Sequence, residues 1–325
     1  MVEKIYYIRE FAAPEASFGF QAQLESILDK KGFVPVLYPR SNYFRRFFFL
    51  LKLFFAIPRH SVIFFLHPLY ARTNRIILRW LLWKGSRPVC IVSDINSIRF
   101  NLPLEEEIGY WKKLRYFIFQ NEKMKEFVED KAGEKVSVNI DLFDLLFDVP
   151  APVRKNSNRV VFAGNIEKCP FINDLHRVKD IQWMIYSSTF VTKHDNINSV
   201  LLSDEIKDKK APDGSYGLVW EGSSIENISG SGGEYLRLVS PLKLSNYLLS
   251  GLPVIIHKEA AMAGFILENK IGFCVESLFG IGKKIEKIPE YEYQSMCLRV
   301  RQIGNKISAG GFTEEVVEKI LKKIK

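Results

Sequence analysis

The stretch VSPLKLSNYLLSGLPVII, residues 239–256, predicts a short helix followed directly by a buried strand. Ser240 suits the N-cap of that helix and Pro241 suits its first turn. Gly251 suits the C-terminal cap, and Pro253 opens an apolar run typical of a strand that is buried on both faces. A helix joined by a tight turn to such a strand is the repeating unit of a parallel α/β sheet.

The same alternation of short apolar strands and helix-length segments extends along the whole chain. The chain is too long for a single hydrophobic core, so more than one domain is expected. The proline-rich and polar run at 148–158 interrupts it and is followed by a fresh strand, so we place the domain boundary there. We predict an α/β protein with two Rossmann-like domains, residues 1–150 and 151–325, facing an interdomain cleft. The predicted strands are 4–8, 33–37, 62–66, 89–92, 116–119, 159–164, 181–186, 217–220, 253–257 and 272–275, with helices near 18–31 and at 312–325.

Composition narrows the class of protein. The chain is 47% hydrophobic and 26% charged, which is typical of a globular protein rather than a disordered one. Four dispersed cysteines without a CxxC pair indicate neither a zinc site nor a disulfide framework, which suits a reducing cytoplasm. Residues 1–10 carry charges where a signal peptide needs an apolar core. The apolar run 47–56 is far shorter than the about 20 residues that span a bilayer.

The net charge of +9 is unevenly distributed. No acidic residue occurs between Asp29 and Asp94, where twelve basic residues fall. A field of one sign attracts nucleic acid, anionic lipid or phosphorylated substrates, and charge alone does not choose among them. The basic residues are Lys30, Lys31, Arg40, Arg45, Arg46, Lys52, Arg59, Arg72, Arg75, Arg79, Lys84 and Arg87.

Three local patterns are candidates for phosphate binding. Lys243 lies in a first helical turn, where a cation is unfavourable unless an anion is bound; a solvated lysine on a capped surface helix is the equal alternative. Gly164 breaks a strand at a sheet edge where α/β folds bind ligands, with Lys168 in the turn. A tight turn with a solvated lysine, which many proteins contain, is the alternative. The run SGSGGE, residues 229–234, fails both the GxGxxG and P-loop spacings, so we predict a mobile connector and no nicotinamide or flavin cofactor.

Longer segments resemble a known bacterial family in the correct order along nearly the whole chain. Residues 213–222 and 235–278 resemble the C-terminal domain of the glucosyltransferases that glycosylate streptococcal serine-rich adhesins, and equally that of β-1,6-galactofuranosyltransferases. SDINSIR at 93–99 is similar to the family's HD-I-x-x-L-R segment. Residues 116–148 are similar to its N-x-x-M helix and F-D-Y-L end, and 162–171 to its GNL-x-K segment.

The resemblance implies a GT-B fold, a UDP-sugar substrate, no required metal and no cofactor. It implies an N-terminal domain that binds the acceptor and a C-terminal domain that holds the nucleotide sugar. The sequence contains no DxD pair, which metal-using transferases need to hold a hard cation. The residues carried over are Ser240 and Lys243 at the diphosphate with Gly164, Asn165 and Lys168 beside it, and Tyr186 near the uracil or ribose.

The chain also departs from the family pattern. Leu242 stands where the N-P-H-K motif has histidine, and Ser93 replaces the histidine of the H-D pair. Asp94 follows a buried strand and is our candidate for the residue that takes the acceptor proton, with helix capping as its structural alternative. Glu15 and His67 are the runners-up for that role and, with Ser17, candidates on the acceptor side. A solvated Glu15 and a His67 that only shapes a turn before Pro68 are the alternatives.

The basic aromatic stretch 43–59, YFRRFFFLLKLFFAIPR, combines arginines with phenylalanines at helical spacing. Two interpretations stay open. An amphipathic helix of this kind can lie in an anionic membrane surface beside a lipid-linked acceptor. Alternatively, its phenylalanines form the core of the N-terminal domain or an oligomer interface, with solvated arginines.

We therefore predict a metal-independent hexosyltransferase that moves galactofuranose, glucose or N-acetylglucosamine from a UDP-sugar to a glycan acceptor in surface polysaccharide or glycoprotein biosynthesis. The sequence leaves the sugar, the acceptor and the stereochemistry open. A catalytically silent sugar-nucleotide-binding scaffold is the alternative, and a polyanion-binding protein a more remote one, because no recognised nucleic-acid motif accompanies the charge. We expect a homo-oligomer in the cytoplasm, with peripheral contact at the membrane's inner face under the first interpretation above.

Overall fold

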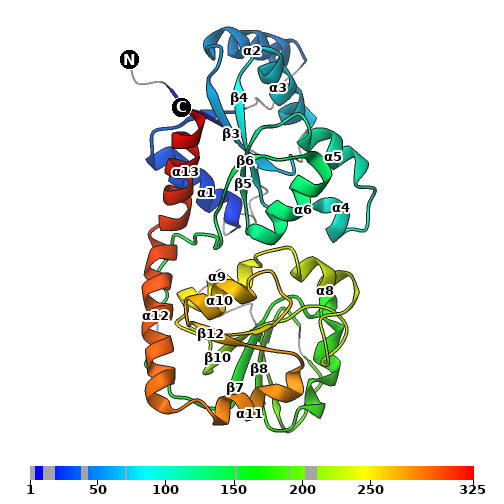
Figure 1. The fold of residues 1–325 in the computed structure, drawn as a ribbon, viewed down its shortest axis with the longest axis vertical. Helices are drawn as coiled ribbons and strands as arrows, with labels where there is room; N and C mark the ends of the chain where they lie inside the picture. Colours follow the sequence, from blue (N-terminus) through cyan, green and yellow to red (C-terminus); the bar gives the residue numbers. More distant parts are fainter. Residues whose placement is uncertain are drawn as a thin grey trace. The chain divides into compact units, whose positions relative to one another are not determined.

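The computed structural model describes residues 4–9, 19–37, 43–69, 72–150, 152–189, 191–201 and 211–325. The chain forms two compact units, Met1–Ile140 with Thr313–Lys325 and Asp141–Phe312, which we call the first and second domains. Each contains a six-stranded parallel sheet with helices on its faces (Figure 1). The predicted alternation of strands and helices is therefore present in both halves.

The sheet of the first domain has the order β2-β1-β3-β4-β5-β6, and all its strands are parallel. The central strands β3 and β4 are apolar runs with nearly every side chain buried, as expected where helices cover both faces. The strands are β1 (Tyr6–Ile8), β2 (Val34–Val36), β3 (Val62–His67), β4 (Arg87–Val92), β5 (Tyr116–Phe119) and β6 (Val136–Asn139). Strand β6 was not predicted, because all four of its side chains are only half-buried.

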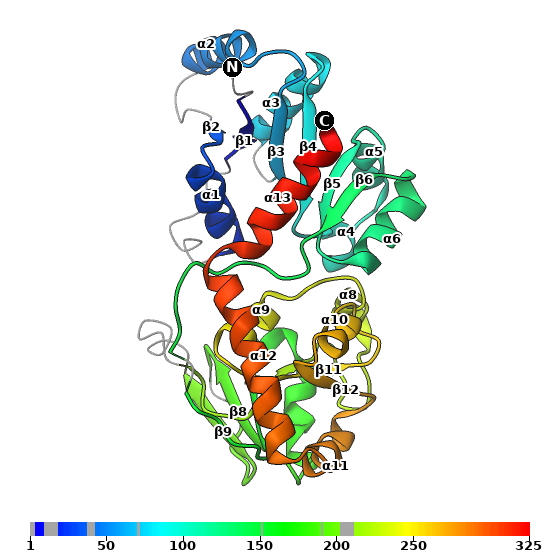
Figure 2. The ribbon, with the colours of Figure 1, turned by 60° about the vertical axis from the view of Figure 1, so that its left-hand side comes forward.

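The helices of the first domain come from both ends of the chain. They are α1 (Phe20–Lys30), α2 (Tyr43–Ala56), α3 (Arg72–Trp83), α4 (Asn96–Arg99), α5 (Glu105–Trp111), α6 (Glu122–Ala132) and α13 (Gly311–Ile324). Helix α13 lies against this domain, with Lys31 Nζ 3.0 Å from Glu318 Oε1 and Arg87 donating to the carbonyl of Ile324 (Figure 2). Within the described residues, no helix combines the length and the apolarity that crossing a membrane requires.

The domain limits differ from the predicted 1–150 and 151–325 at both places. The units change at Ile140 because the segment after it is bonded to the second domain: the Phe143 amide donates to Ser245 Oγ, and the Leu145 amide to the carbonyl of Ile307. The last thirteen residues return to the first domain. The periodicity of the terminal helix predicts an apolar face but not the sheet that covers it.

The sheet of the second domain has the order β12-β11-β10-β7-β8-β9 and is also wholly parallel. After β7 the chain adds β8 and β9 on one side, and β10 then returns to the other side of β7. The strands are β7 (Arg159–Ala163), β8 (Gln182–Ser187), β9 (Ile197–Leu201), β10 (Tyr216–Val219), β11 (Val254–His257) and β12 (Gly272–Val275). The edge strand β9 was not predicted.

Helices and 3₁₀ turns flank this second sheet. They are η2 (Ile166–Lys168), η3 (Pro170–Arg177), α8 (Gly230–Leu236), α9 (Leu242–Leu249), α10 (Ala263–Glu268), η4 (Leu278–Gly280), α11 (Ile281–Glu286) and α12 (Glu290–Ser308). The predicted connector 229–234 is wrong, because these residues begin α8. Its glycines permit close packing: a Cβ on Gly233 would lie 2.4 Å from the carbonyl carbon of Ile228.

Helix α9 is fixed to the sheet by one aromatic side chain. The ring of Tyr247 lies against Gly217 of β10, where an added Cβ would be 2.4 Å from its Cγ. The hydroxyl of Tyr247 accepts a 2.8 Å hydrogen bond from the amide of Ala163 in β7. One helix is thus bound to two neighbouring strands by packing and by a half-buried hydrogen bond.

Replacing Gly217→Ala should lower the free energy of unfolding by about 1–3 kcal/mol, because the added methyl overlaps a ring that cannot move away. Gly280→Ala is the matched control, since its Cβ would meet no atom within 4 Å and its φ of −84° suits any residue. Urea unfolding followed by fluorescence measures both. Equal stability of the two variants would contradict the tight contact.

Candidate functional site

The carboxyl edge of the second sheet has a point where the chain connections diverge. Because β7 continues to β8 on one side and β10 lies on the other, the ends of β7 and β10 form the topological switch point. In open α/β sheets, ligands bind at this place. Gly164 follows β7, and Glu221 follows β10 after Trp220.

Lys243, in the first turn of α9, reaches this switch point. Its Nζ lies 2.5 Å from Glu221 Oε1 and 4.5 Å from the centre of the Phe162 ring. A Cβ placed on Gly164 would be 3.8 Å from the same nitrogen. The predicted diphosphate residues Gly164 and Lys243 are therefore brought together by the fold. The lysine side chain is only 15% exposed, and a carboxylate is its partner.

Sequence reasoning missed Glu221. Its second oxygen, Oε2, accepts a hydrogen bond from Cys169 Sγ at 3.1 Å. Burial, with the nearby Glu221 charge, raises the pKa of the Cys169 thiol to about 12, so the thiol is a neutral donor at physiological pH. The available signal was an acidic residue two positions after a buried strand, at the ligand-binding edge of the sheet.

The other predicted diphosphate residues are placed differently. Asn165 caps η2, accepting a 2.9 Å hydrogen bond from the amide of Glu167, and Lys168 is exposed. The hydroxyl of Ser240 donates to Met262 Sδ at 2.9 Å. The N-cap of α9 is Pro241, one residue later than predicted.

Only the backbone of Tyr186 contacts the residues of the switch point. Its carbonyl accepts a 3.0 Å hydrogen bond from the amide of Gly164. Its side chain is buried, and its hydroxyl accepts a 2.8 Å hydrogen bond from the amide of Asp213, before β10. The phenol of Tyr186 therefore bonds within the domain, whereas the sequence predicted that it lies beside the uracil or ribose of the donor.

The first domain carries a second polar group at the carboxyl edge of its sheet. His67 ends β3, and its Nε2 lies 3.2 Å from Glu107 Oε1. The imidazole stacks on Tyr110 at 5.7 Å and meets the edge of Trp111 at 6.0 Å. Glu107 also accepts hydrogen bonds from the amides of Asn96 and Ser97. Sequence reasoning missed Glu107.

Asp94 follows β4 and is 7% exposed. Burial raises the pKa of its carboxyl group, and the ion pair with Arg99 offsets only part of this effect. The N-cap of α4 is Ile95, so Asp94 is not that helix's cap residue. A carboxyl with raised proton affinity at a ligand-binding edge has the property that an acid–base residue needs. Glu15 and Ser17 lie outside the described residues.

The hydrogen bonds to Glu107 should make stability depend on pH. Although burial opposes its ionisation, the bonds from His67 and Ser97 lower the pKa of Glu107 below 4.5 overall. The stabilisation by this carboxylate is therefore complete above pH 4.5 and is lost as the pH falls through the lower folded-state value. Relative to Glu107→Gln, the wild type should be more stable at pH 6, and the difference should shrink below pH 4.5. Urea unfolding across this range measures it; a constant difference would contradict the effect.

Residues 160–320 match the family model of the glucosyltransferase 3-like C-terminal domain, which covers nearly all of the second domain. This part of the chain is similar to that family. The match includes β7, the switch point and the helix that carries Lys243. The resemblance inferred from the ordered motifs is thereby confirmed.

The relatives that the chain resembles in sequence are named as glycosyltransferases. The chain is 28% identical over 215 residues to the β-1,6-galactofuranosyltransferase WbbI of Escherichia coli K12, covering 64% of each protein. It is 24% identical over 235 residues to glucosyltransferase 3 of Streptococcus parasanguinis, covering 70% of this chain and 68% of that protein. The chain thus matches a little under two thirds of the galactofuranosyltransferase's length.

Solved structures share the fold of the whole chain. A glycosyltransferase from Rickettsia africae has a TM-score of 0.58 at 12% identity and covers 98% of each chain. Anabaena HepE, solved in complex with UDP-glucose, has a TM-score of 0.57 at 9% identity and covers 99% of each chain. At this level of identity the likeness concerns the fold alone, and it confirms the predicted GT-B class with two Rossmann-like domains.

Proposed function

We propose that this protein is a glycosyltransferase that moves a hexosyl group from a UDP-sugar to a glycan acceptor in the biosynthesis of a surface polysaccharide or glycoprotein. The observation that carries the proposal is Lys243 at the topological switch point of a glucosyltransferase 3-like domain. The names of the relatives support galactofuranose or glucose as the sugar. N-acetylglucosamine stays a third candidate.

In the proposed reaction, Lys243 exchanges Glu221 for the diphosphate of the donor. A charge-assisted contact to phosphate, together with the amides at the start of α9, stabilises negative charge on the departing UDP. These groups supply the electrostatic role that a divalent ion has in other transferases. We therefore propose that the reaction needs no metal ion and no cofactor.

Asp94 is the proposed acceptor of the proton from the attacking hydroxyl. Its buried carboxyl has a raised pKa, which makes it a stronger base than an exposed aspartate, and Arg99 holds its orientation. His67 lies at the same sheet edge and is proposed to help shape the acceptor side. The roles of Glu15 and Ser17 stay predictions from the sequence.

The finer features of the prediction are proposals as well. The donor is a UDP-sugar, which agrees with the UDP-glucose bound in the structure of HepE. A lipid-linked glycan acceptor, self-association and a cytoplasmic location with peripheral membrane contact complete the proposal. The absence of a spanning helix among the described residues is compatible with such contact.

Lys243→Ala should weaken UDP binding by about 10- to 100-fold, the effect of losing one charge-assisted hydrogen bond of about 1.5–3 kcal/mol. Calorimetry in chelator-containing buffer, with ADP and GDP as controls, measures the affinity. Lys319→Ala is a matched control variant, because Lys319 also pairs with a glutamate, at 2.6 Å, but lies in α13 of the first domain.

Selective UDP binding that Lys243→Ala weakens and Lys319→Ala leaves unchanged justifies a screen of UDP-sugars for UDP release with glycan acceptors. No UDP binding at millimolar concentration would sink the assignment of this domain as a donor site. UDP binding without turnover of any donor would favour the alternative of a sugar-nucleotide-binding scaffold.

Glu221→Gln should tighten UDP binding several-fold while leaving the affinity for uridine unchanged. The substitution removes a negative charge beside the proposed diphosphate and releases Lys243 from a competing partner. Parallel titrations with UDP and uridine separate the phosphate contribution from that of the nucleoside. Weaker binding of both ligands would show that the carboxylate supports the nucleoside instead.

A further inference from the structure

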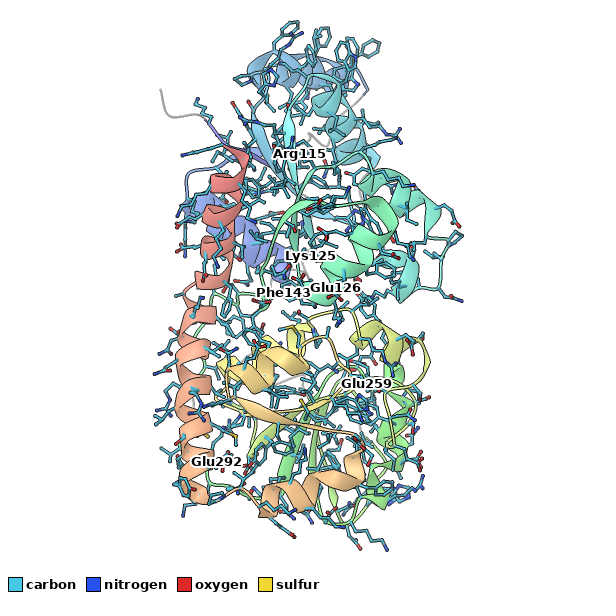
Figure 3. All side chains as sticks on the ribbon, viewed as in Figure 1. Arg115, Lys125, Glu126, Phe143, Glu259 and Glu292 are labelled. Atoms are coloured by element: carbon cyan, nitrogen blue, oxygen red, sulfur yellow. The ribbon has the colours of Figure 1, made fainter. Side chains whose placement is uncertain are left out.

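Helix α2 presents large apolar side chains to the outside of the first domain. Five of them form what we call the α2 face, and Figure 3 shows side chains projecting outward from this helix. The α2 face consists of Phe44 (73% exposed), Phe47 (48%), Phe48 (63%), Leu51 (39%) and Phe55 (75%). At roughly 150–250 Å² for each phenylalanine, this exposes on the order of 500 Å² of apolar surface. A patch of that size is in the upper range of what monomeric proteins expose, and such patches are often functional.

The spacing of these residues puts them on one stripe. They occur at positions i, i+3, i+4, i+7 and i+11, which is the pattern of an amphipathic helix turned toward a core. Here the same stripe points outward, and no described side chain of α2 is fully buried. The interpretation that these five side chains belong to the domain core is therefore wrong.

A side chain beside the α2 face, Phe54, attaches α2 to α3 near the end of the helix. The Phe54 ring stacks on Trp83 at 5.7 Å and meets the edge of Trp80 at 6.0 Å. Lys84 Nζ lies 4.4 Å from the Phe54 ring centre and donates a 2.5 Å hydrogen bond to the carbonyl of Ile57. These contacts hold the helix so that its α2 face stays outward.

Basic residues surround the α2 face. Arg45 and Lys52 are one heptad apart along one flank of the stripe, and both are exposed. Arg59 follows the helix, and Arg79 lies on the neighbouring α3; both are also exposed. The sequence from residue 30 to 93 contains no acidic residue. The exposed ring of Trp83, at 82%, adds a side chain that favours the boundary between water and lipid.

We propose that the α2 face binds the surface of an anionic lipid bilayer. The phenylalanines enter the boundary between headgroups and acyl chains, while the basic residues contact the negative headgroups. Charge complementarity selects this partner over a second copy of the chain, because two copies would bring the same basic residues together. The inference rests on the peripheral membrane contact included in the proposed function and names the surface that makes it; it does not depend on the transferase activity.

Flotation of the purified full-length protein with vesicles tests the proposal. The wild type should float with vesicles of phosphatidylcholine and phosphatidylglycerol, and much less with phosphatidylcholine alone. Phe48→Ser combined with Phe55→Ser should reduce the bound fraction at least about ten-fold, because two deeply inserted rings are lost. Val153→Ser combined with Leu298→Ser is the control, since these exposed side chains lie in the second domain.

The charge contribution has its own variant. Arg45→Glu combined with Lys52→Glu should abolish the preference for anionic vesicles, and high salt should have the same effect on the wild type. Equal binding to neutral and anionic vesicles, or no flotation of the wild type, would overturn the proposal. Equal loss with the control pair would overturn it too.

Light scattering after gel filtration tests whether a second copy of the chain, and not a membrane, covers the α2 face. A lipid-free dimer that Phe48→Ser with Phe55→Ser dissociates, in a protein that does not float, would identify the α2 face as an interface between copies and overturn the membrane proposal. The affinity for UDP should be the same in all these variants. UDP binding therefore reports on the proposed donor site separately, whichever result flotation gives.

Discussion

The packing of Tyr247 on Gly217 is the contact on which the geometry of the donor site depends. The bare backbone of β10 lets the ring reach the sheet, and its hydroxyl is bonded to the amide of Ala163 in β7. Lys243 precedes Tyr247 by four residues, so both project from one side of α9. Because the helix is held against both strands, the lysine lies over Phe162 at the switch point.

In that position Lys243 is paired with Glu221, a partner that a bound anion can replace. Glu221 neutralises Lys243 in a site where both side chains are largely buried, and the Cys169 thiol satisfies the second carboxylate oxygen. Removing either member of such a pair is costly, so a ligand must supply an equivalent anion. A diphosphate does so with more charge than one carboxylate. The pairing thus favours a phosphorylated ligand over a neutral sugar. It does not distinguish one UDP-sugar from another.

Sequence reasoning found what depends on local pattern. Buried parallel strands are continuous apolar runs, so the central strands and the strand edge at Gly164 were predicted. The edge strands β6 and β9 are partly polar and were missed. Glu221 and Glu107 were missed because their partners are remote: Lys243 is 22 positions from Glu221, and His67 is 40 positions from Glu107. Only the folded sheet edges bring such residues together.

Helix α2 shows what the pattern of apolar residues cannot predict. A stripe at i, i+3, i+4 and i+7 predicts an amphipathic helix but does not say what lies opposite the stripe. In α13 the first domain covers it, whereas in α2 the stripe is exposed although Phe54 beside it contacts α3. Exposing that much apolar surface carries a solubility cost that a monomer avoids by substituting polar residues. Its position among cations, with no acid between residues 30 and 93, is what distinguishes a lipid-facing surface from an uncovered part of the core.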